Sequence, residues 1–274
     1  MSLRGLRVSA PVSVSVSVSV SVSLNGGRTA ADGGAVPLSP PDVVESALGA
    51  VAAGAGEVLV HPRTPCGPES LSPRVVGPLL EAVRGAGVSV PLSVSAGIGA
   101  EPDPAGRLER VRSWTVLPDR AVVHFAEPGA EELAEALLAR GVAVDAMVPL
   151  GGEGAGPGAE PGAVEPAPGA LARFLARPVR DPARIRLAVE LAVADPALVA
   201  GLRWLPPVPL LLFGREAAAW PVLRLAARCG ADARIGVGDV LHLPDGRPAR
   251  SNAELVSAAL EAAGTETAAT ASSR

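Results

Sequence analysis

The chain has 274 residues, of which 48% are hydrophobic and 2% aromatic, and its formal net charge is −4. That length suits one α/β barrel of about 250 residues or two smaller domains. The 24 cationic residues are scattered, whereas a nucleic-acid surface requires clustered positive charge, so we expect no nucleic-acid partner. No segment reaches the roughly eighteen apolar residues of a membrane span, so we also expect no membrane partner.

An unbroken alternation of valine and serine occupies residues 12–23 and leads into Leu24-Asn25-Gly26-Gly27. A period of two would place every valine on one face of a strand and every serine on the other. The repeat would reach roughly 40 Å at about 3.3 Å per residue, far beyond a typical strand. Because a slip of two residues reproduces the same pattern, nothing inside the repeat fixes its register. We therefore assign residues 1–19 to an extension outside the core.

After this repeat, short runs of valine, leucine and isoleucine alternate with helical stretches rich in alanine, leucine and glutamate. This order is typical of βα units around a parallel sheet. The clearest strands are 57–61, 88–95, 121–125, 142–148, 208–213 and 233–239. Residues 173–179 fit either a further strand or the end of a helix. With the amino-terminal strand, these elements predict a single TIM (β/α)8 barrel over residues 20–264.

Other local signals mark helix starts and irregular segments. Ser39 before Pro40, and Ser251 three residues before Glu254, have the features of helix N-termini. The Gly/Pro-rich segment 151–170 disfavours a helix, so we expect a mobile loop on the site side of the barrel. Residues 265–274 are expected to form a disordered tail.

The two cysteines carry little chemistry in this pattern. Cys66 and Cys229 are far apart and lack metal-ligand spacing, which indicates neither a zinc knuckle nor a disulfide scaffold. Their usage favours a reducing compartment, so we expect a cytoplasmic protein.

Several co-linear motifs lie where the strands of such a barrel end, which is where TIM-barrel enzymes carry their site residues. They read LNGGRT at 24–29, VHPR at 60–63 with ESL at 69–71, VSAGIG at 94–99, AWPVL at 219–223 and RIGVGD at 234–239. Together they resemble the beta-keto acid cleavage enzymes, a family that includes 3-keto-5-aminohexanoate cleavage protein. The resemblance covers nearly all of the chain after the repeat, except about residues 150–205.

The resemblance implies a zinc-dependent TIM barrel that condenses a beta-keto acid with acetyl-CoA and releases acetoacetate and a new CoA thioester. It also implies keto acid and CoA-ester partners and a homo-oligomer. Such chemistry needs a Lewis acid on the keto oxygen, a cation for the carboxylate and a group that handles a proton. In the family, a His-x-His pair on the second strand and a glutamate after the eighth hold the zinc.

This chain departs from the family at the metal. The His-x-His pair reads Leu59-Val60-His61, and the ligand glutamate is replaced by Gly238, so only His61 remains. Catalytic zinc sites usually have three protein ligands and an open position. We therefore expect weak or absent zinc binding. We also expect the double reversal Leu59→His with Gly238→Glu to restore tight zinc if the other site residues keep the family's arrangement.

The resemblance assigns three further residues to the reaction. Arg234 matches the arginine that binds the keto acid's carboxylate, Asp239 matches the acidic residue beside the lost ligand, and Ser95 matches the serine of the family's Ser-Thr-Gly motif. A purely structural ion pair between Arg234 and Asp239 is the alternative, because a buried cation needs a partner. His124 fits either a core histidine or a substitute metal ligand beside His61 and Asp239.

Two functions from different classes follow. One is a keto acid cleavage enzyme with a rebuilt or weaker metal site, and the other is a non-catalytic barrel that keeps a carboxylate pocket around Arg234. The segment that commonly reads His-Gly-Glu-Gly in close relatives reads Phe213-Gly214-Arg215-Glu216 here, and the fourth strand carries Val122 in place of a polar residue. Metal analysis separates the two functions, since the enzyme predicts about one bound divalent ion per chain.

Overall fold

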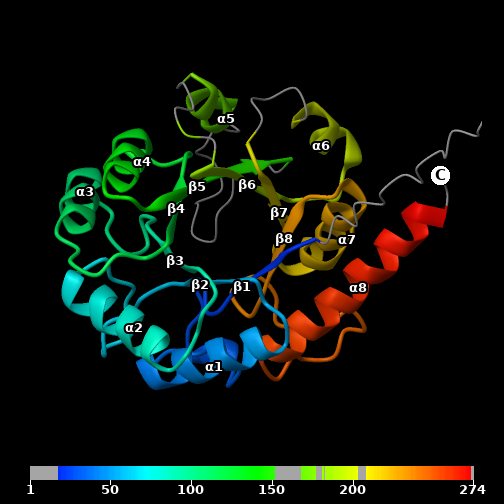
Figure 1. Ribbon diagram of the computed structural model, residues 1–274, viewed down its shortest axis with the longest axis horizontal. Coiled ribbons are helices and arrows are strands. Elements are labelled where there is room, and N and C mark those ends of the chain that lie inside the picture. Colours follow the sequence, from blue (N-terminus) through cyan, green and yellow to red (C-terminus); the bar gives the residue numbers. More distant parts are fainter. Residues whose placement is uncertain (1–17, 152–167, 177–180, 182, 203–207, 273–274) are drawn as a thin grey trace, which may run out of the picture.

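The computed structural model describes residues 18–151, 168–176, 181, 183–202 and 208–272. All strands of this part are parallel, and they close into a barrel in the order of the sequence (Figure 1). The strands are β1 Val20–Ser23, β2 Glu57–Val60, β3 Leu92–Ser95, β4 Arg120–His124, β5 Ala143–Leu150, β6 Ile185–Leu191, β7 Leu210–Phe213 and β8 Asp232–Ile235. The predicted TIM (β/α)8 barrel is confirmed.

Helices connect successive strands and cover the outer face of the barrel (Figure 1). They are α1 Pro40–Ala52, α2 Pro73–Gly85, α3 Pro104–Arg112, α4 Ala130–Ala139, α5 Pro168–Leu175, α6 Pro196–Leu202, α7 Ala219–Cys229 and α8 Asn252–Ser272, with two short 3-10 helices, η1 Ala30–Asp32 and η2 Glu216–Ala218. The last helix continues to Ser272, so residues 265–272 are helical where the sequence suggested a tail.

Both predicted helix starts carry a side-chain cap. The Ser39 hydroxyl accepts a hydrogen bond from the Asp42 N–H at 3.3 Å, and the Asp42 carboxylate accepts one from the Ser39 N–H at 3.1 Å. The Ser251 hydroxyl likewise accepts from the Glu254 N–H at 3.2 Å, but the Glu254 carboxylate accepts from the Arg250 N–H. Both caps satisfy an N–H that the helix leaves free, and only the first forms the reciprocal box.

Four residues of the Val-Ser repeat form β1, and both neighbouring strands fix their register. Ser21 lies opposite Glu57 of β2 and opposite Arg234 of β8. The valines of β1 join the core between barrel and helices, and its serines are buried on the other face. Context outside the repeat therefore chooses the register that the repeat itself leaves open. Residues 1–17 lie outside the described part of the chain.

The sixth strand lies where the sequence was not expected to supply one. Residues 173–175 belong to α5, so the helical alternative holds there, and β6 spans Ile185–Leu191 instead. Its sequence, Ile-Arg-Leu-Ala-Val-Glu-Leu, alternates with a period of two and includes the charged residues Arg186 and Glu190. Residues 168–170 open α5, which shortens the expected 151–170 loop because proline is tolerated in a first turn. Residues 152–167 lie outside the described residues.

The inward side chains of the strands form three layers. The middle layer is apolar and consists of Leu59, Val122, Met147, Ala188, Leu211 and Phe213, to which β7 contributes two successive inward residues, Leu211 and Phe213. Two residues earlier along the strands lie charged side chains, which include Glu57, Asp145 and Arg186. Two residues later lie the polar groups at the carboxyl ends of the strands. The apolar layer thus separates a charged floor from a polar mouth.

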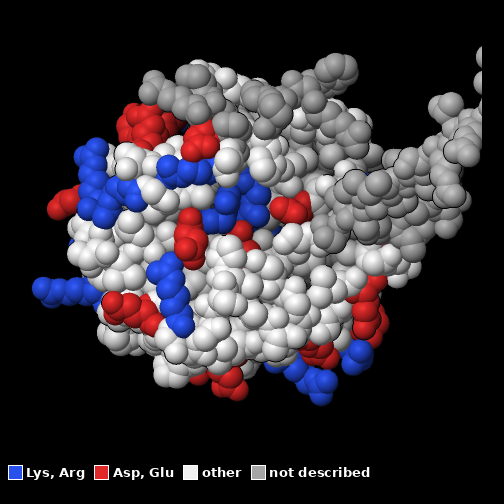
Figure 2. Space-filling view, viewed as in Figure 1, with Lys and Arg blue, Asp and Glu red and all other residues white. Residues whose placement is uncertain are grey.

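The charged groups on the face seen in Figure 2 are mixed in sign. Figure 2 shows basic and acidic side chains next to one another on the viewed face, with no field of one sign. Of the helices described, none combines the length and the apolar character that crossing a bilayer requires.

Candidate functional site

Polar side chains gather at the mouth of the barrel, where the strands end. His61 follows β2, His124 ends β4 and Arg215 follows β7, each two residues beyond a member of the apolar layer. Because side chains alternate along a strand, all three face the interior. Arg234 of β8 and Asp239 complete this group, which we call the mouth cluster. The charges of Arg215 and Arg234 reach both histidines.

Arg234 and Asp239 form a closed ion pair. The guanidinium donates from Nε to Oδ2 at 3.1 Å and from Nη2 to Oδ1 at 2.7 Å, and the two residues are 6% and 1% exposed. The guanidinium carbon lies 3.4 Å from the centroid of the Phe213 ring, so the face of the cation is also covered. A cation occupied on its edge and its face fits the structural alternative better than a carboxylate-binding role.

The loop after β1 holds His61 by its backbone. Asn25 accepts a hydrogen bond from the His61 N–H at 2.9 Å and donates its amide to the His61 carbonyl at 3.1 Å. The imidazole Nδ1 is buried and has no hydrogen-bond partner among the described residues. Burial, and then the positive charge of Arg234, holds the pKa of His61 well below its usual range. The ring is therefore uncharged at neutral pH.

His124 lies beside a carboxylate that other groups hold in place. Its Nδ1 is 3.7 Å from Oε1 of Glu127, whose Oε2 accepts from the Ile98 N–H at 3.1 Å and lies 3.2 Å from Nη1 of Arg107. Burial, and then nearby arginines with Arg215 first, lowers the pKa of His124 to about 3. Burial raises the pKa of the Glu127 carboxyl. The mouth cluster thus holds two uncharged imidazoles.

These histidines should make the protein less stable as the pH falls. An unfolded histidine takes up a proton near pH 6.5, whereas the lowered pKa values keep His61 and His124 neutral in the fold. Their contribution is complete above about pH 6.5 and is lost as the pH falls toward the folded pKa, about 3 for His124. Each should cost about 1 kcal/mol between about pH 7 and pH 5.5. Urea unfolding at these two pH values should show a smaller loss of stability for His124→Gln than for the unmodified protein. An equal loss would contradict the assignment of the effect to His124.

The position of the family's first histidine ligand lies inside the apolar layer. Leu59 is 2% exposed and packs with the five other side chains of that layer. One of these five is Val122 of β4, which replaces the family's polar residue. A divalent ion at this point would lose its hydration without gaining a donor, which costs several kcal/mol or more, on the order of a buried unpaired charge.

Backbone occupies the position of the family's glutamate ligand. A Cβ on Gly238 would lie 2.4 Å from Ser23 Oγ and 2.7 Å from the Gly26 nitrogen. Gly26 has φ +54, and its own Cβ would lie 2.8 Å from the Gly238 Cα. The Gly238 N–H also donates to the Ser23 carbonyl at 3.0 Å. The loops after β1 and β8 therefore touch backbone to backbone, with no space for a glutamate.

The donors that remain do not fit a catalytic zinc site. His61 alone survives of the three family ligands, and both oxygens of Asp239 are bound to Arg234. In the described ranges of the chain, no three His, Cys, Asp or Glu side chains are grouped so as to hold a metal ion. The substitute set of His61, His124 and Asp239 is accordingly not assembled in this structure.

Ser95 lies at the end of β3, opposite Val122 in register. It is 4% exposed, and no described residue forms a hydrogen bond with its hydroxyl. Its position at the mouth agrees with a site residue, and its role in a reaction stays a prediction.

Sequence reasoning missed three groups that shape the mouth. Asn25 lay inside the quoted LNGGRT motif, but its clamp on the His61 backbone is a contact between loops 36 positions apart. Glu127 follows His124 by three residues, a spacing that could have suggested the pair. Arg215 was visible as a change from the relatives' glutamate, yet no motif favoured it over Arg234 as the cation of the site.

The barrel and the polar groups at the carboxyl ends of its strands define a TIM-barrel protein of the kind that includes many enzymes. Residues 17–145 and 171–274, well over half of the chain, match the family model for the beta-keto acid cleavage enzymes, so the chain belongs to that family. Membership supports a beta-keto acid cleavage type of enzyme, and it confirms the resemblance seen in the motifs. No curated protein matches the chain.

Solved structures share the fold at low identity. The chain is 15% identical to a truncated 3-deoxy-D-arabino-heptulosonate 7-phosphate synthase from Thermotoga maritima, covering 92% of this chain and 87% of that one with a TM-score of 0.55. It is 14% identical to ObcA in a ternary complex with a C4-CoA adduct and oxalate, covering 87% and 67% with a TM-score of 0.59. Such likeness shows the barrel alone.

Proposed function

We propose that this family member binds a small keto acid by its carboxylate at the barrel mouth and does not carry out zinc-dependent cleavage. The observation that carries this proposal is the backbone contact between Gly26 and Gly238, which occupies the place of a ligand side chain. Leu59 supports it, because the second lost ligand lies in an apolar layer. The alternative function, an active enzyme with a rebuilt metal site, has no donor set to support it among the residues that the structure describes.

The chemistry of the mouth cluster supports retention of a carboxylate ligand. Its arginines supply positive charge, and its neutral imidazoles can exchange hydrogen bonds without adding repulsion or attraction of their own. The apolar layer beneath keeps water away from one side of the ligand, which strengthens charge-assisted hydrogen bonds. Acetyl-CoA as a co-substrate, the particular keto acid and a homo-oligomeric state stay predictions from the family.

Three measurements on the purified full chain test the proposal. We expect far less than one zinc per chain by metal analysis, no acetoacetate-forming turnover of short keto acids with acetyl-CoA, and saturable binding of acetoacetate by calorimetry. Tight stoichiometric zinc together with turnover would favour the active enzyme, and His124→Ala would then show whether that imidazole had become a ligand. Absence of any keto acid binding contradicts the proposal from the other side.

A further inference from the structure

We infer that Arg215, and not Arg234, is the cation that binds the ligand's carboxylate; this inference rests on the proposed function and names the group that performs it. Arg234 occupies the family's arginine position. Its guanidinium already donates two hydrogen bonds to Asp239 and stacks on the Phe213 ring. An incoming carboxylate would have to break a buried bidentate pair to reach it. Breaking a buried ion pair costs more free energy than a new contact at the surface returns.

Arg215 has the capacity that Arg234 lacks. Its side chain is 34% exposed, and its Nε lies 2.9 Å from Oε1 of Glu190, which is 25% exposed. Its terminal nitrogens, Nη1 and Nη2, form no hydrogen bond with any residue that the structure describes. A planar guanidinium with two free nitrogens matches a carboxylate in the bidentate geometry that makes arginine selective for such groups.

A strained turn holds Arg215 at the mouth. Glu216 has φ +47, and it is the only residue apart from glycines with positive φ in the described ranges. Its N–H donates to the Asp239 carbonyl at 2.9 Å, and its carboxylate pairs with Arg28. Gly214 permits the turn, because a Cβ there would lie 2.7 Å from the Ala218 carbonyl oxygen. Backbone strain that the surroundings enforce in this way concentrates at functional sites.

The surroundings of Arg215 favour an anion. The guanidinium is close enough to contribute to the lowered pKa values of His61 and His124, so both rings lie within its electrostatic reach. Neither ring carries a competing charge. The apolar side chain of Phe213, two residues before Arg215, is fully buried beneath the mouth. A carboxylate at Arg215 would therefore find hydrogen-bonding partners and a dry floor in one place.

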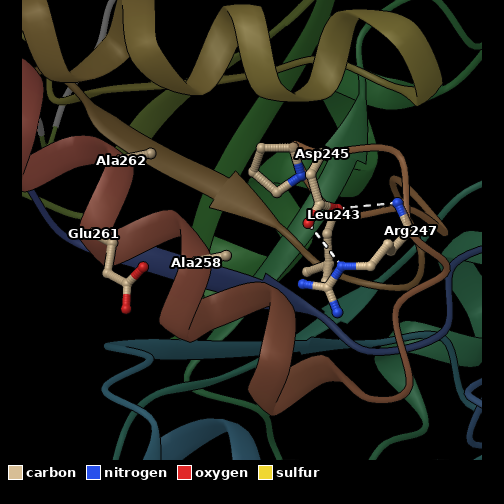
Figure 3. Close-up of a pocket in the computed structure, with 7 residues that line it drawn as sticks. Leu243, Asp245, Arg247, Ala258, Glu261 and Ala262 are labelled. Atoms are coloured by element: carbon tan, nitrogen blue, oxygen red, sulfur yellow. Dashed lines mark hydrogen bonds and ion pairs between the residues drawn. The ribbon is translucent and has the colours of Figure 1, made fainter.

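The hollow on the outside of the barrel offers no equal alternative. It lies between α8 and the loop after β8, and its only arginine, Arg247, already pairs with Asp245 at 2.7 Å (Figure 3). Glu261 adds a further negative charge to its lining. Both members of the Arg247 pair are more than half exposed, so water screens them. Arg247 therefore supplies a matched control for a change of one arginine.

The experiment measures binding of three probes by calorimetry at low salt: acetoacetate, acetate and the uncharged methyl acetoacetate. The test variant is Arg215→Met with Glu190→Gln, which removes the cation without leaving its partner carboxylate unpaired. We expect it to bind acetoacetate and acetate about 10- to 100-fold more weakly, as loss of charge-assisted hydrogen bonds predicts. The affinity of Arg215→Lys for both anions should lie between those of the unmodified protein and the double variant. Arg247→Met should bind as the unmodified protein does. Methyl acetoacetate should bind weakly to all of them.

Each outcome separates the inference from the proposed function. If acetate binding depends on Arg215 but the keto acid binds no better than acetate, Arg215 stands as the anion site and keto acid recognition fails. If the double variant, with an unchanged melting temperature, binds acetoacetate as tightly as the unmodified protein, the assignment of Arg215 is overturned and the proposed function survives. If the unmodified protein binds neither anion, both are overturned.

Discussion

Gly238→Glu is expected to destabilise the barrel and not to restore a zinc ligand. The new Cβ would lie within 3 Å of Ser23 Oγ and of the Gly26 backbone nitrogen, and only the hydroxyl can move aside cheaply. Forcing atoms into such a contact typically costs about 1–3 kcal/mol, and occasionally more. The glutamate carboxylate would add the cost of burying a charge beside Asp239, which is 1% exposed. We expect a loss of roughly 3 kcal/mol or more in chemical denaturation.

Two neighbouring glycines provide a matched comparison. Gly26→Ala should also be costly, because it combines φ +54 with a Cβ 2.8 Å from the Gly238 Cα. Gly27→Ala, one residue further along the same loop, should change stability by less than about 0.5 kcal/mol, because its nearest atom would be 3.9 Å away. Equal stability of the three variants would contradict the close approach of the two loops.

The same contact revises what the sequence suggested about restoring the metal. From the motifs alone, Leu59→His with Gly238→Glu should rebuild a three-ligand site. In the structure, the first change places an imidazole in an apolar layer and the second requires the loops after β1 and β8 to separate. We therefore expect the double variant to be less stable and still unable to bind zinc tightly. Metal analysis of its folded fraction, with a stoichiometric ion as the contrary result, decides the point.

Most of the barrel could be predicted because its strands obey local rules. Buried parallel strands read as short apolar runs, and their order in the chain is also their order in a closed barrel. β6 was not predicted, because Arg186 and Glu190 interrupt the apolar run that marks the other buried strands. Their inward charges are balanced by groups more than 20 residues away, such as Asp145 and Arg215. Pairing over that distance leaves no local signature.

The site was predictable to the extent that it repeats family motifs. Those motifs placed His61, Arg234 and Asp239 at one mouth and showed that Leu59 and Gly238 could not act as ligands. The sequence could not show which charged groups already satisfy one another's hydrogen-bonding capacity. The bidentate pair that occupies Arg234 depends on side-chain geometry across five residues. Whether the terminal nitrogens of Arg215 have partners depends on the conformation of the loop after β7.

Arg186→Met is expected to cost about 3–5 kcal/mol, because it removes the central cation from a buried charge network at the floor of the barrel. Arg186 donates to both oxygens of Glu57 at 2.7 and 2.9 Å and to both oxygens of Asp145 at 3.0 and 2.6 Å. These three residues are at most 7% exposed. Burial raises the pKa of Glu57, and Arg186 is the largest influence that opposes the rise. The variant should therefore leave Glu57 to take up a proton.

Neutralising the partners separates lost charge pairing from lost packing. Adding Glu57→Gln and Asp145→Asn to Arg186→Met removes the two carboxylates that the first change leaves without Arg186, but it also removes both partners of Arg120, whose side chain is 17% exposed. The triple variant should therefore recover part of the lost stability. Arg247→Met, in an exposed pair, should change the free energy of unfolding by less than about 0.5 kcal/mol. Denaturant titrations of the four proteins near neutral pH provide the measurement.

A small cost for Arg186→Met, close to that of Arg247→Met, would show that water reaches the floor and screens it. A cost that the triple variant does not reduce would instead assign the role of Arg186 to packing of its long side chain inside the barrel.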